Sequence, residues 1–487
     1  MTLKRVTLVV AIAAAMLDTP RSVRGAGTAD LSRRSAADSA SAKADLSRRS
    51  AADNASAKAD LSRRSAADNA SAKADLSRRS AADNASAKAD WLQWGGAGRN
   101  FMPDATGLAA SWPAGGPKKL WSRALGEGHS SILVEGARIY TMYRPLGMLS
   151  VVRRSQEEVV AAIDAASGKT IWEFKYPAPT DGLDFSQGAG PHSTPLIVGN
   201  RIYATSTRKE LFALDKATGQ RVWAHDFMKE YNAPSPGRGY TCSPILYNGT
   251  IIVTVGGPGQ AIAAFNQQTG ALVWKAGDFE MAPASPILID VDGQQQLVLF
   301  AGERVAGLDP SSGRMLWSRA HKTDWGLNIS TPVWSPADHL LFISSAYGSG
   351  SRVLELHQAG GNTTVAEKWF NNRMRVHIGT VIHIGDYMYG ASGDFGPSFL
   401  TAVELKTGKI VWQDRSFGRA QLLYADGKLI ILDEDGNLAL ATVSPQGLKV
   451  LSRASVLENL SWTPPTLAGT TLYVRDRKTI AAFALGK

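Results

Sequence analysis

The chain has 487 residues, of which 44% are apolar and 20% are charged, a composition typical of a globular protein with a full hydrophobic core. Its formal net charge is +10, but most of this excess lies in the first 89 residues, so the rest of the chain lacks the clustered positive charge of a nucleic-acid-binding domain. A single cysteine, Cys242, excludes an internal disulfide, a four-cysteine metal site and a CxxCH haem attachment.

The first 29 residues have the features of a secretory signal peptide. Lys4 and Arg5 precede an apolar run at 6–17, which is too short to span a bilayer stably. We expect cleavage after Gly25 or Ala29, and a mature chain without a transmembrane segment. The alternative is a buried N-terminal helix. A signal peptide predicts secretion across the inner membrane, into the periplasm or out of the cell.

Residues 30–89 are four tandem copies of a fifteen-residue repeat, DLSRRSAADSASAKA followed by three copies of DLSRRSAADNASAKA. Each copy contains one large apolar residue, and the fifteen-residue spacing places successive leucines on different sides of a helix. The segment therefore cannot bury a face, and we predict a disordered or loosely helical spacer. A partner-binding coiled coil is the alternative, but the repeat lacks the heptad pattern.

From residue 90 onward, an eleven-residue pattern recurs: AIDAASGKTIW at 162–172, ALDKATGQRVW at 213–223 and AFNQQTGALVW at 264–274. Each copy joins two alternating apolar runs by a polar turn that ends in Gly, which predicts a β-hairpin. The acidic or amide side chain bonds the backbone of the turn, Gly supplies the left-handed conformation, and Trp fills the wedge between neighbouring sheets. The residues of this pattern are Asp164, Gly168, Trp172, Asp215, Gly219, Trp223, Gly270, Trp274, Asp309, Gly313, Trp317, Gly408 and Trp412.

Another hairpin precedes these copies, so each unit of about 40–50 residues contributes four strands, as in a β-propeller blade. Outer-strand tryptophans fall at 121, 172, 223, 274, 317, 369 and 412, and Leu451 takes the eighth position. The fifth unit is degraded, because LELHQAGGNTTVAEKW at 354–369 replaces the regular turn. KKLWSRALG at 118–126 is an outer strand that no inner strands precede. TLYVRDRKTIAAFAL at 471–485 contains inner strands that no outer strand follows. Pairing them predicts an all-β, eight-bladed propeller of four-stranded blades over residues 90–487, with the last blade closed by N- and C-terminal strands.

The repeated A-x-D-x-x-T-G-x-x-x-W pattern resembles the tryptophan-docking repeat of the pyrroloquinoline quinone (PQQ) β-propeller family. The resemblance covers nearly everything from residue 91 to 487, including the opening WLQWGGAGRNFMPDATGLAASWP. It implies one of two classes: quinoprotein dehydrogenases, or non-catalytic propellers such as the lipoprotein subunit of the outer-membrane β-barrel assembly machinery. The large alcohol dehydrogenases of the first class have two adjacent cysteines and a Ca²⁺ site, whereas Cys242 has no neighbouring cysteine.

The loops that lead into the innermost strands should meet at one mouth of the central channel. They supply His129, His192, Arg238, Trp325, Asn328, Arg373, Arg375 and His377. Arginines beside an aromatic plate suit an anionic, planar small molecule such as a quinone. The alternative is that the histidines and the Ser/Thr-Pro dipeptides of these loops satisfy backbone groups in a narrow ring. Both interpretations remain open at this point.

Two acidic stretches, DVDG at 290–293 and DEDGN at 433–437, fall between apolar alternating runs. Neither has the spacing of a calcium loop, so we predict hairpin turns and no metal site. The sequence also lacks the GxSxG, P-loop, GxGxxG and HExxH motifs of serine hydrolases, nucleotide hydrolases, Rossmann domains and zinc proteases.

We therefore expect an exported, monomeric, non-catalytic propeller that binds a protein or small-molecule partner in the cell envelope, with no catalytic residues, no cofactor and no nucleic acid. The alternative is a PQQ-dependent oxidoreductase that acts on alcohols or sugars, and only this alternative requires PQQ with Ca²⁺.

Overall fold

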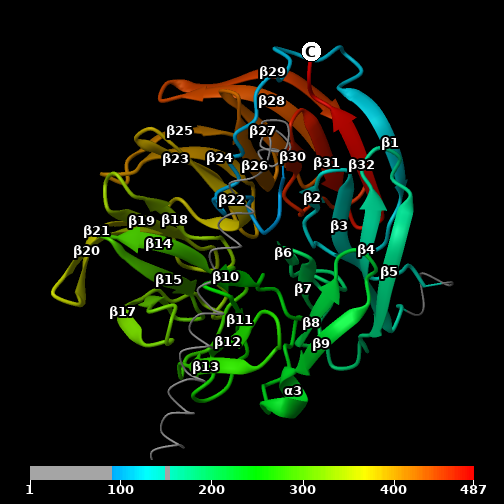
Figure 1. Cartoon of the computed structure of the whole chain (residues 1–487). Helices are drawn as coiled ribbons and strands as arrows, with labels where there is room; N and C mark the ends of the chain where they lie inside the picture. The colour runs from blue at the N-terminus through cyan, green and yellow to red at the C-terminus, as the bar shows by residue number, and fades with distance from the viewer. Residues whose placement is uncertain (1–89, 148–153) are drawn as a thin grey trace, which may run out of the picture. The chain divides into compact units, whose positions relative to one another are not determined.

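The computed structural model describes residues 90–147 and 154–487, and the segments expected to be a signal peptide and a spacer, 1–29 and 30–89, lie outside the described residues. The described chain forms eight four-stranded antiparallel sheets, arranged around a central axis in Figure 1. In seven sheets the strands follow one another in chain order, and the innermost strand comes first. The predicted eight-bladed propeller is confirmed.

The first four blades, numbered in chain order, run from Leu133 to Ala320. Their strands are β2 (Leu133–Glu135), β3 (Arg138–Tyr143), β4 (Glu157–Asp164) and β5 (Thr170–Pro177); β6 (Leu196–Val198), β7 (Arg201–Thr205), β8 (Glu210–Asp215) and β9 (Arg221–Asp226); β10 (Ile245–Tyr247), β11 (Thr250–Thr254), β12 (Ile262–Asn266) and β13 (Leu272–Ala276); and β14 (Ile287–Val291), β15 (Gln294–Phe300), β16 (Arg304–Leu308) and β17 (Met315–Ala320). A single helical turn, α3 (Phe227–Glu230), follows β9.

The last four blades run from Val333 to the C-terminus, and the eighth also includes β1 from the N-terminal part of the chain. Their strands are β18 (Val333–Ser335), β19 (Leu340–Ser344), β20 (Ser351–Ala359) and β21 (Asn362–Asn371); β22 (Val376–Ile384), β23 (Tyr387–Ser392), β24 (Phe399–Glu404) and β25 (Ile410–Asp414); β26 (Ala420–Ala425), β27 (Lys428–Asp433), β28 (Asn437–Ser444) and β29 (Gly447–Ser455); and β30 (Thr466–Ala468), β31 (Thr471–Arg475), β32 (Thr479–Ala484) and β1 (Lys118–Ala124).

The repeated turn adopts the conformation that its residue types predict. In the first blade, Asp164 Oδ1 accepts hydrogen bonds from the Ser167 amide at 2.8 Å and the Ser167 hydroxyl at 2.6 Å. These bonds hold the pKa of the Asp164 carboxyl below its ordinary value. Gly168 follows with a φ of +70°, in the left-handed region that glycine tolerates.

The tryptophans dock between blades, as expected. Trp172 covers Gly219 of the next blade so closely that a Cβ on this glycine would lie 2.5 Å from the indole. Its Nε1 donates to the carbonyl of Lys216 at 3.1 Å. Trp121, Trp223, Trp274 and Trp369 pack in the same way over Gly168, Gly270, Gly313 and Gly408. A turn in one blade therefore provides the seat for the outer strand of the previous blade.

Trp317 also lies in the wedge between two blades, in a hydrophobic cluster with Leu341 and Leu354 of the fifth blade, but its contacts differ from those of the other tryptophans. Its Nε1 donates to Gln296 Oε1 of its own blade at 2.7 Å, and its ring lies over Gly307. The regular copies of the pattern have Ala at the position of Gly307, and the smaller residue makes room for the indole. The fifth blade lacks the regular turn, so Trp317 has no glycine seat there.

The two ends of the chain complete the eighth blade. β1 pairs antiparallel with β32, from Lys118 opposite Ala484 to Ala124 opposite Thr479. Trp121 Nε1 donates to the carbonyl of Ala165 in the first blade at 2.9 Å. The predicted closure is confirmed, and it leaves no unpaired strand edge at the junction of the termini.

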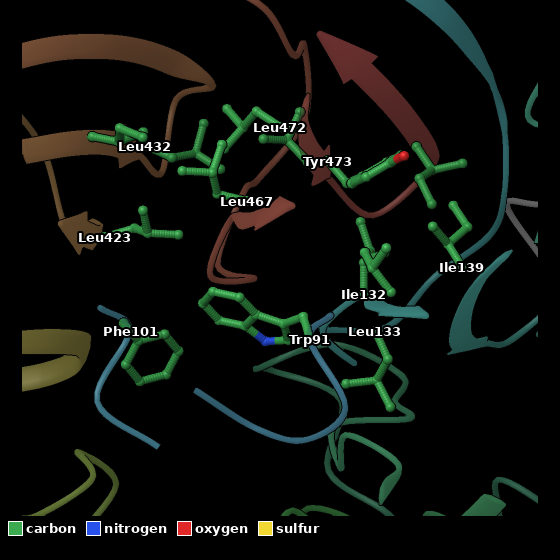
Figure 2. Close-up of a cluster of buried hydrophobic side chains, with 14 of the residues drawn as sticks. Trp91, Phe101, Ile132, Leu133, Ile139, Leu423, Leu432, Leu467, Leu472 and Tyr473 are labelled. Carbon is green, nitrogen blue, oxygen red and sulfur yellow. The ribbon is translucent and has the colours of Figure 1, made fainter. Parts of the chain in front are cut away.

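Residues 90–105, which we name the N-terminal strap, cross the ring before β1 begins. Trp91 exchanges backbone hydrogen bonds with Val134 at 2.7 and 2.9 Å, and Phe101 accepts one from Tyr424 in the seventh blade at 3.1 Å. Figure 2 shows the Trp91 and Phe101 side chains among apolar residues of blades one, seven and eight, and each is 2% exposed. The sequence assigned the strap to the propeller but predicted no role for it.

Candidate functional site

The central channel contains a cavity of about 210 Å³ at the face where the innermost strands begin, which we name the channel mouth. Five of the eight predicted residues line it: His129, His192, Arg238, Trp325 and His377. Trp94 of the N-terminal strap also lines the cavity, and its Nε1 donates to Thr331 Oγ1 at 2.9 Å. The strap therefore supplies one wall of the site.

The other three predicted residues do not line this cavity. Asn328 is fully buried, its amide donates to the Ala301 carbonyl at 2.6 Å, and its oxygen accepts from the Ser345 hydroxyl, so it is committed to loop structure. Arg375 lies 3.7 Å from Asp394, and Arg373 is exposed.

One side of the mouth is an aromatic cluster. The rings of Trp325 and Tyr347 stack with centroids 5.7 Å apart, and Phe395 packs against both. The Arg238 guanidinium lies 5.4 Å from the Trp325 ring centroid, within the range of a cation–π contact. Trp325 is 56% exposed and Phe395 is 76% exposed, so the cluster presents apolar surface to solvent.

The opposite side is built around Trp462. The His129 ring lies 5.5 Å from Trp462 and stacks on His192 at 5.4 Å. The guanidinium groups of Arg419 and Arg477 lie 5.7 and 5.3 Å from the Trp462 centroid. Trp462 is thus held between imidazole and guanidinium groups, and its Nε1 donates to Glu434 at 3.0 Å.

Two buried arginines hold the loops that carry His129 and His192. Arg475 donates to the carbonyls of Ser130, Met142 and Gly126 at 3.3, 2.7 and 3.2 Å, and these bonds hold the loop of His129. Arg144 donates to the Ala189 carbonyl in the loop of His192 at 3.1 Å. Its other nitrogens bond the Ala178 carbonyl and the Glu158 carboxylate at 2.8 and 2.7 Å. Because buried charges need complete hydrogen bonding, these networks fix the loops.

Below the mouth, hydroxyl groups link successive blades. The Ser131 amide donates to Thr194 Oγ1 at 2.9 Å, the Thr194 amide to Ser243 Oγ at 3.1 Å, and the Ser243 amide to Ser285 Oγ at 3.0 Å. Each hydroxyl therefore satisfies a backbone donor of the previous blade. This is the structural role that the sequence offered as an alternative for the Ser/Thr-Pro dipeptides.

The three histidines of the mouth are neutral at pH 7. Burial, followed by the charges of Arg477 and Arg144, lowers the pKa of His192 to about 4, and burial with Arg419 lowers that of His377 to about 4. Burial and the neighbouring His192 and Arg477 also hold the pKa of His129 well below its ordinary value. The positive charge at the mouth therefore comes from the arginines.

Sequence reasoning missed Tyr347, Phe395 and Trp462. Tyr347 lies between β19 and β20, and Phe395 between β23 and β24. Both reach the channel mouth because the loop after the second strand of a blade lies on the same face as the loop before its first strand. Trp462 precedes β30 in the stretch SWTPP, which has the Thr-Pro dipeptide of the other mouth loops. That dipeptide was the available signal for Trp462.

A wider groove of about 830 Å³ continues from the mouth between Lys209, Pro234 and Phe279. Arg238, Thr241 and Leu327 line both spaces. No helix in the described part of the chain has both the length and the apolarity needed to cross a bilayer.

Curated relatives fall into two groups. The outer membrane protein assembly factor BamB of Moranella endobia is 21% identical over 362 residues, covering 74% of this chain and 78% of that protein. The 1-butanol dehydrogenase (quinone) of Thauera butanivorans is 25% identical over 210 residues, covering 39% of this chain and 32% of that enzyme.

Solved structures share the fold. BamB from Moraxella catarrhalis superposes with a TM-score of 0.51 at 17% identity, over 76% of this chain and 99% of that one. Quinohemoprotein alcohol dehydrogenase from Comamonas testosteroni gives 0.57 at 15% identity, over 83% and 81%. The protein family described as outer membrane protein assembly factor BamB matches residues 156–414, more than half of the chain. The chain belongs to this BamB family of β-propellers.

Proposed function

We propose that the protein is a non-catalytic binding scaffold of the cell envelope, and that the channel mouth holds a protein partner. The observation that carries this proposal is the aromatic cluster beside Arg238, in which Trp325 and Phe395 are exposed and both pack against the buried Tyr347. Aromatic residues and arginine contribute most of the binding energy at protein interfaces. On surfaces without a partner, large apolar patches of this kind are rare.

The dimensions of the mouth favour a polypeptide over a compact ligand. The cavity of about 210 Å³ continues into the groove of about 830 Å³, so an extended segment fits across both. Arg238 and Arg419 pair with Asp184 and Glu434 at 3.2 and 3.1 Å, so the anchors of the segment should be apolar side chains that pack on Trp325 and Phe395. Relatives named outer membrane protein assembly factor are consistent with a partner in outer membrane protein assembly.

The dehydrogenase alternative requires a calcium-bound quinone, and the residues of the mouth do not fit this group. Calcium takes oxygen ligands, mostly carboxylates, yet the cavity lining contains no Asp or Glu among the described residues. Asn328, the nearest predicted amide, already bonds the surrounding loops. Cys242 is buried, and burial raises its pKa to about 11, which makes the thiol unreactive.

Site-specific photocrosslinking in the periplasm tests the proposal. A benzophenone amino acid in place of Phe395 should crosslink to an envelope protein of outer membrane assembly, and Trp325→Ala combined with Arg238→Ala should reduce the yield at least tenfold. A probe at Thr218, in an exposed turn on the opposite face, is the matched control. Equal yields from both positions would contradict the proposal, as would substrate-dependent dye reduction by the purified protein with PQQ and Ca²⁺.

A further inference from the structure

Three potential metal ligands meet at the junction between the fourth and fifth blades, on the face opposite the channel mouth. Asp292 lies in the turn between β14 and β15, His339 in the turn between β18 and β19, and His357 near the end of β20. One donor atom from each lies within 4.8 Å of the other two. We name these residues the His-Asp cluster.

The spacing of the cluster suits a shared cation better than direct hydrogen bonds. His339 Nδ1 lies 3.3 Å from Asp292 Oδ1, and His357 Nδ1 lies 3.7 Å from Asp292 Oδ2. Ligand atoms around a tetrahedral zinc ion, bound at about 2.0–2.2 Å, lie roughly 3.3–3.5 Å apart. His339 Nδ1 is buried and has no hydrogen-bond partner, so a nitrogen faces the carboxylate without satisfying it.

The local structure holds the three side chains of the His-Asp cluster close together without an ion. Asp292 and His339 have φ values of +51° and +56°, which the tight turns impose. Asp292 Oδ2 accepts the Gln358 backbone amide at 2.8 Å, a bond that crosses the junction between the blades. The rings of His339 and His357 stack with centroids 4.9 Å apart. His357 is 54% exposed, so a small rotation of its side chain completes the geometry.

The cluster lies at the junction where the tryptophan contact between blades is irregular, because Trp317 reaches Thr363 of the fifth blade through Gln296. Trp317 turns back over Gly307 of the fourth blade, whereas Trp172, Trp223, Trp274 and Trp369 cover glycines of the following blade. The altered fifth unit, whose turn at 359–362 reads AGGN in place of the regular pattern, is also the unit that supplies His357. The junction with the irregular tryptophan contact is thus also the junction that holds the His-Asp cluster.

The charge of the His-Asp cluster also suits a bound cation. Asp292 contributes one negative charge, and Glu355 lies 3.9 Å from His357 Nε2. Lys368 pairs with Glu355 Oε2 at 3.3 Å, whereas Glu355 Oε1 is the oxygen that lies near His357. Two imidazoles and one carboxylate are the donor set of many zinc sites, and imidazole selects zinc-class cations over calcium or magnesium.

We propose that Asp292, His339 and His357 bind a divalent transition-metal ion of the zinc class and that the ion ties the fourth blade to the fifth. Three protein ligands leave one tetrahedral position for water or for a donor from another molecule. This inference is independent of the channel mouth and of the proposed partner.

Titration calorimetry with Zn²⁺ on the full mature chain, purified without a histidine tag, tests the site. We expect one ion per chain with a dissociation constant in the micromolar range or tighter, and a rise in the thermal midpoint because the ion binds only the folded state. Co²⁺ should give the intense visible absorption of a four-coordinate ion. His357→Ala should weaken binding at least tenfold and abolish the thermal shift.

The matched control is His383→Ala, which removes a histidine outside the cluster and should leave zinc binding unchanged. Because His357 is exposed, His357→Ala should fold with the metal-free thermal midpoint of the unaltered protein. No stoichiometric binding to the unaltered protein, or equal affinity in His357→Ala, would overturn the proposal.

Discussion

Single residues decide how each blade meets the next. Five outer-strand tryptophans lie over a glycine across the junction, where a Cβ would overlap the indole, whereas Trp412 bonds the Ser444 carbonyl of the next blade without such a glycine. Where the seat is absent, Trp317 lies over Gly307 within its own blade. Gly307, which stands where the regular copies have Ala, is thus coupled to the position of the Trp317 ring. The fourth blade keeps its tryptophan buried, in a cluster with fifth-blade residues, without the glycine seat.

This coupling predicts that Gly307→Ala destabilises the protein. The new Cβ would lie 2.1 Å from Trp317 Nε1, so the indole must leave its place over β16 and lose the bond to Gln296. We expect a loss of about 1–3 kcal/mol in the free energy of unfolding, measured by urea titration with tryptophan fluorescence. Gly115→Ala is the control, because a Cβ there meets nothing within 4 Å. Equal stability of the two variants would contradict this account of Trp317.

At the scale of elements, two segments outside the regular repeat hold the ring together. β1 closes the eighth blade through its pairing with β32. The N-terminal strap connects blades that are far apart in the ring, because Trp91 bonds Val134, Leu92 accepts the Ile197 amide at 2.8 Å and Phe101 accepts the Tyr424 amide. The strap therefore acts as a brace across the channel as well as a wall of the cavity.

Removal of the Trp91 side chain should show how much the brace contributes. Trp91 is 2% exposed and packs between three blades, so Trp91→Ala should lower the free energy of unfolding by about 3–5 kcal/mol, through lost burial and the cavity that remains. Trp325→Ala is the matched control, because its side chain is 56% exposed and should cost much less. If both substitutions lower the urea midpoint equally, the strap is not a structural brace.

The repeat made the blades predictable, whereas the strap and much of the site were not. Every blade with a regular turn has Asp, Asn or Glu, then Gly and Trp, at fixed spacing, so one hairpin explains the rest. Trp91 and Phe101 make contacts with residues hundreds of positions away, and no local pattern marks them. The polar side chain of Asn328 could bind a ligand, but its amide donates a hydrogen bond to the Ala301 carbonyl of a neighbouring loop instead. Tyr347 and Phe395 come from loops of irregular length, which periodicity cannot place.

The folded protein keeps several buried histidines in the neutral form. Burial lowers the pKa of His192 and His377 to about 4 and that of His321 to about 3, and neighbouring arginines act in the same direction. In the unfolded chain an imidazole binds a proton as the pH falls through about 6.5. Between pH 6.5 and 4 the unfolded state therefore binds more protons than the folded state, and the free energy of unfolding decreases as the pH is lowered.

We expect urea-unfolding measurements at half-unit intervals from pH 7 to pH 4.5 to show this loss, to which each such histidine contributes at most about 1.4 kcal/mol per pH unit. His377→Gln removes one of these groups and should make the slope near pH 5 shallower by about that amount, whatever its effect on stability at pH 7. Tyr347→Phe is the control, because it removes the hydroxyl that bonds His377 but retains the imidazole, so the slope should persist. An unchanged slope in His377→Gln would mean that His377 already accepts its proton near pH 6 in the folded protein, and that burial beside Arg419 does not keep it neutral.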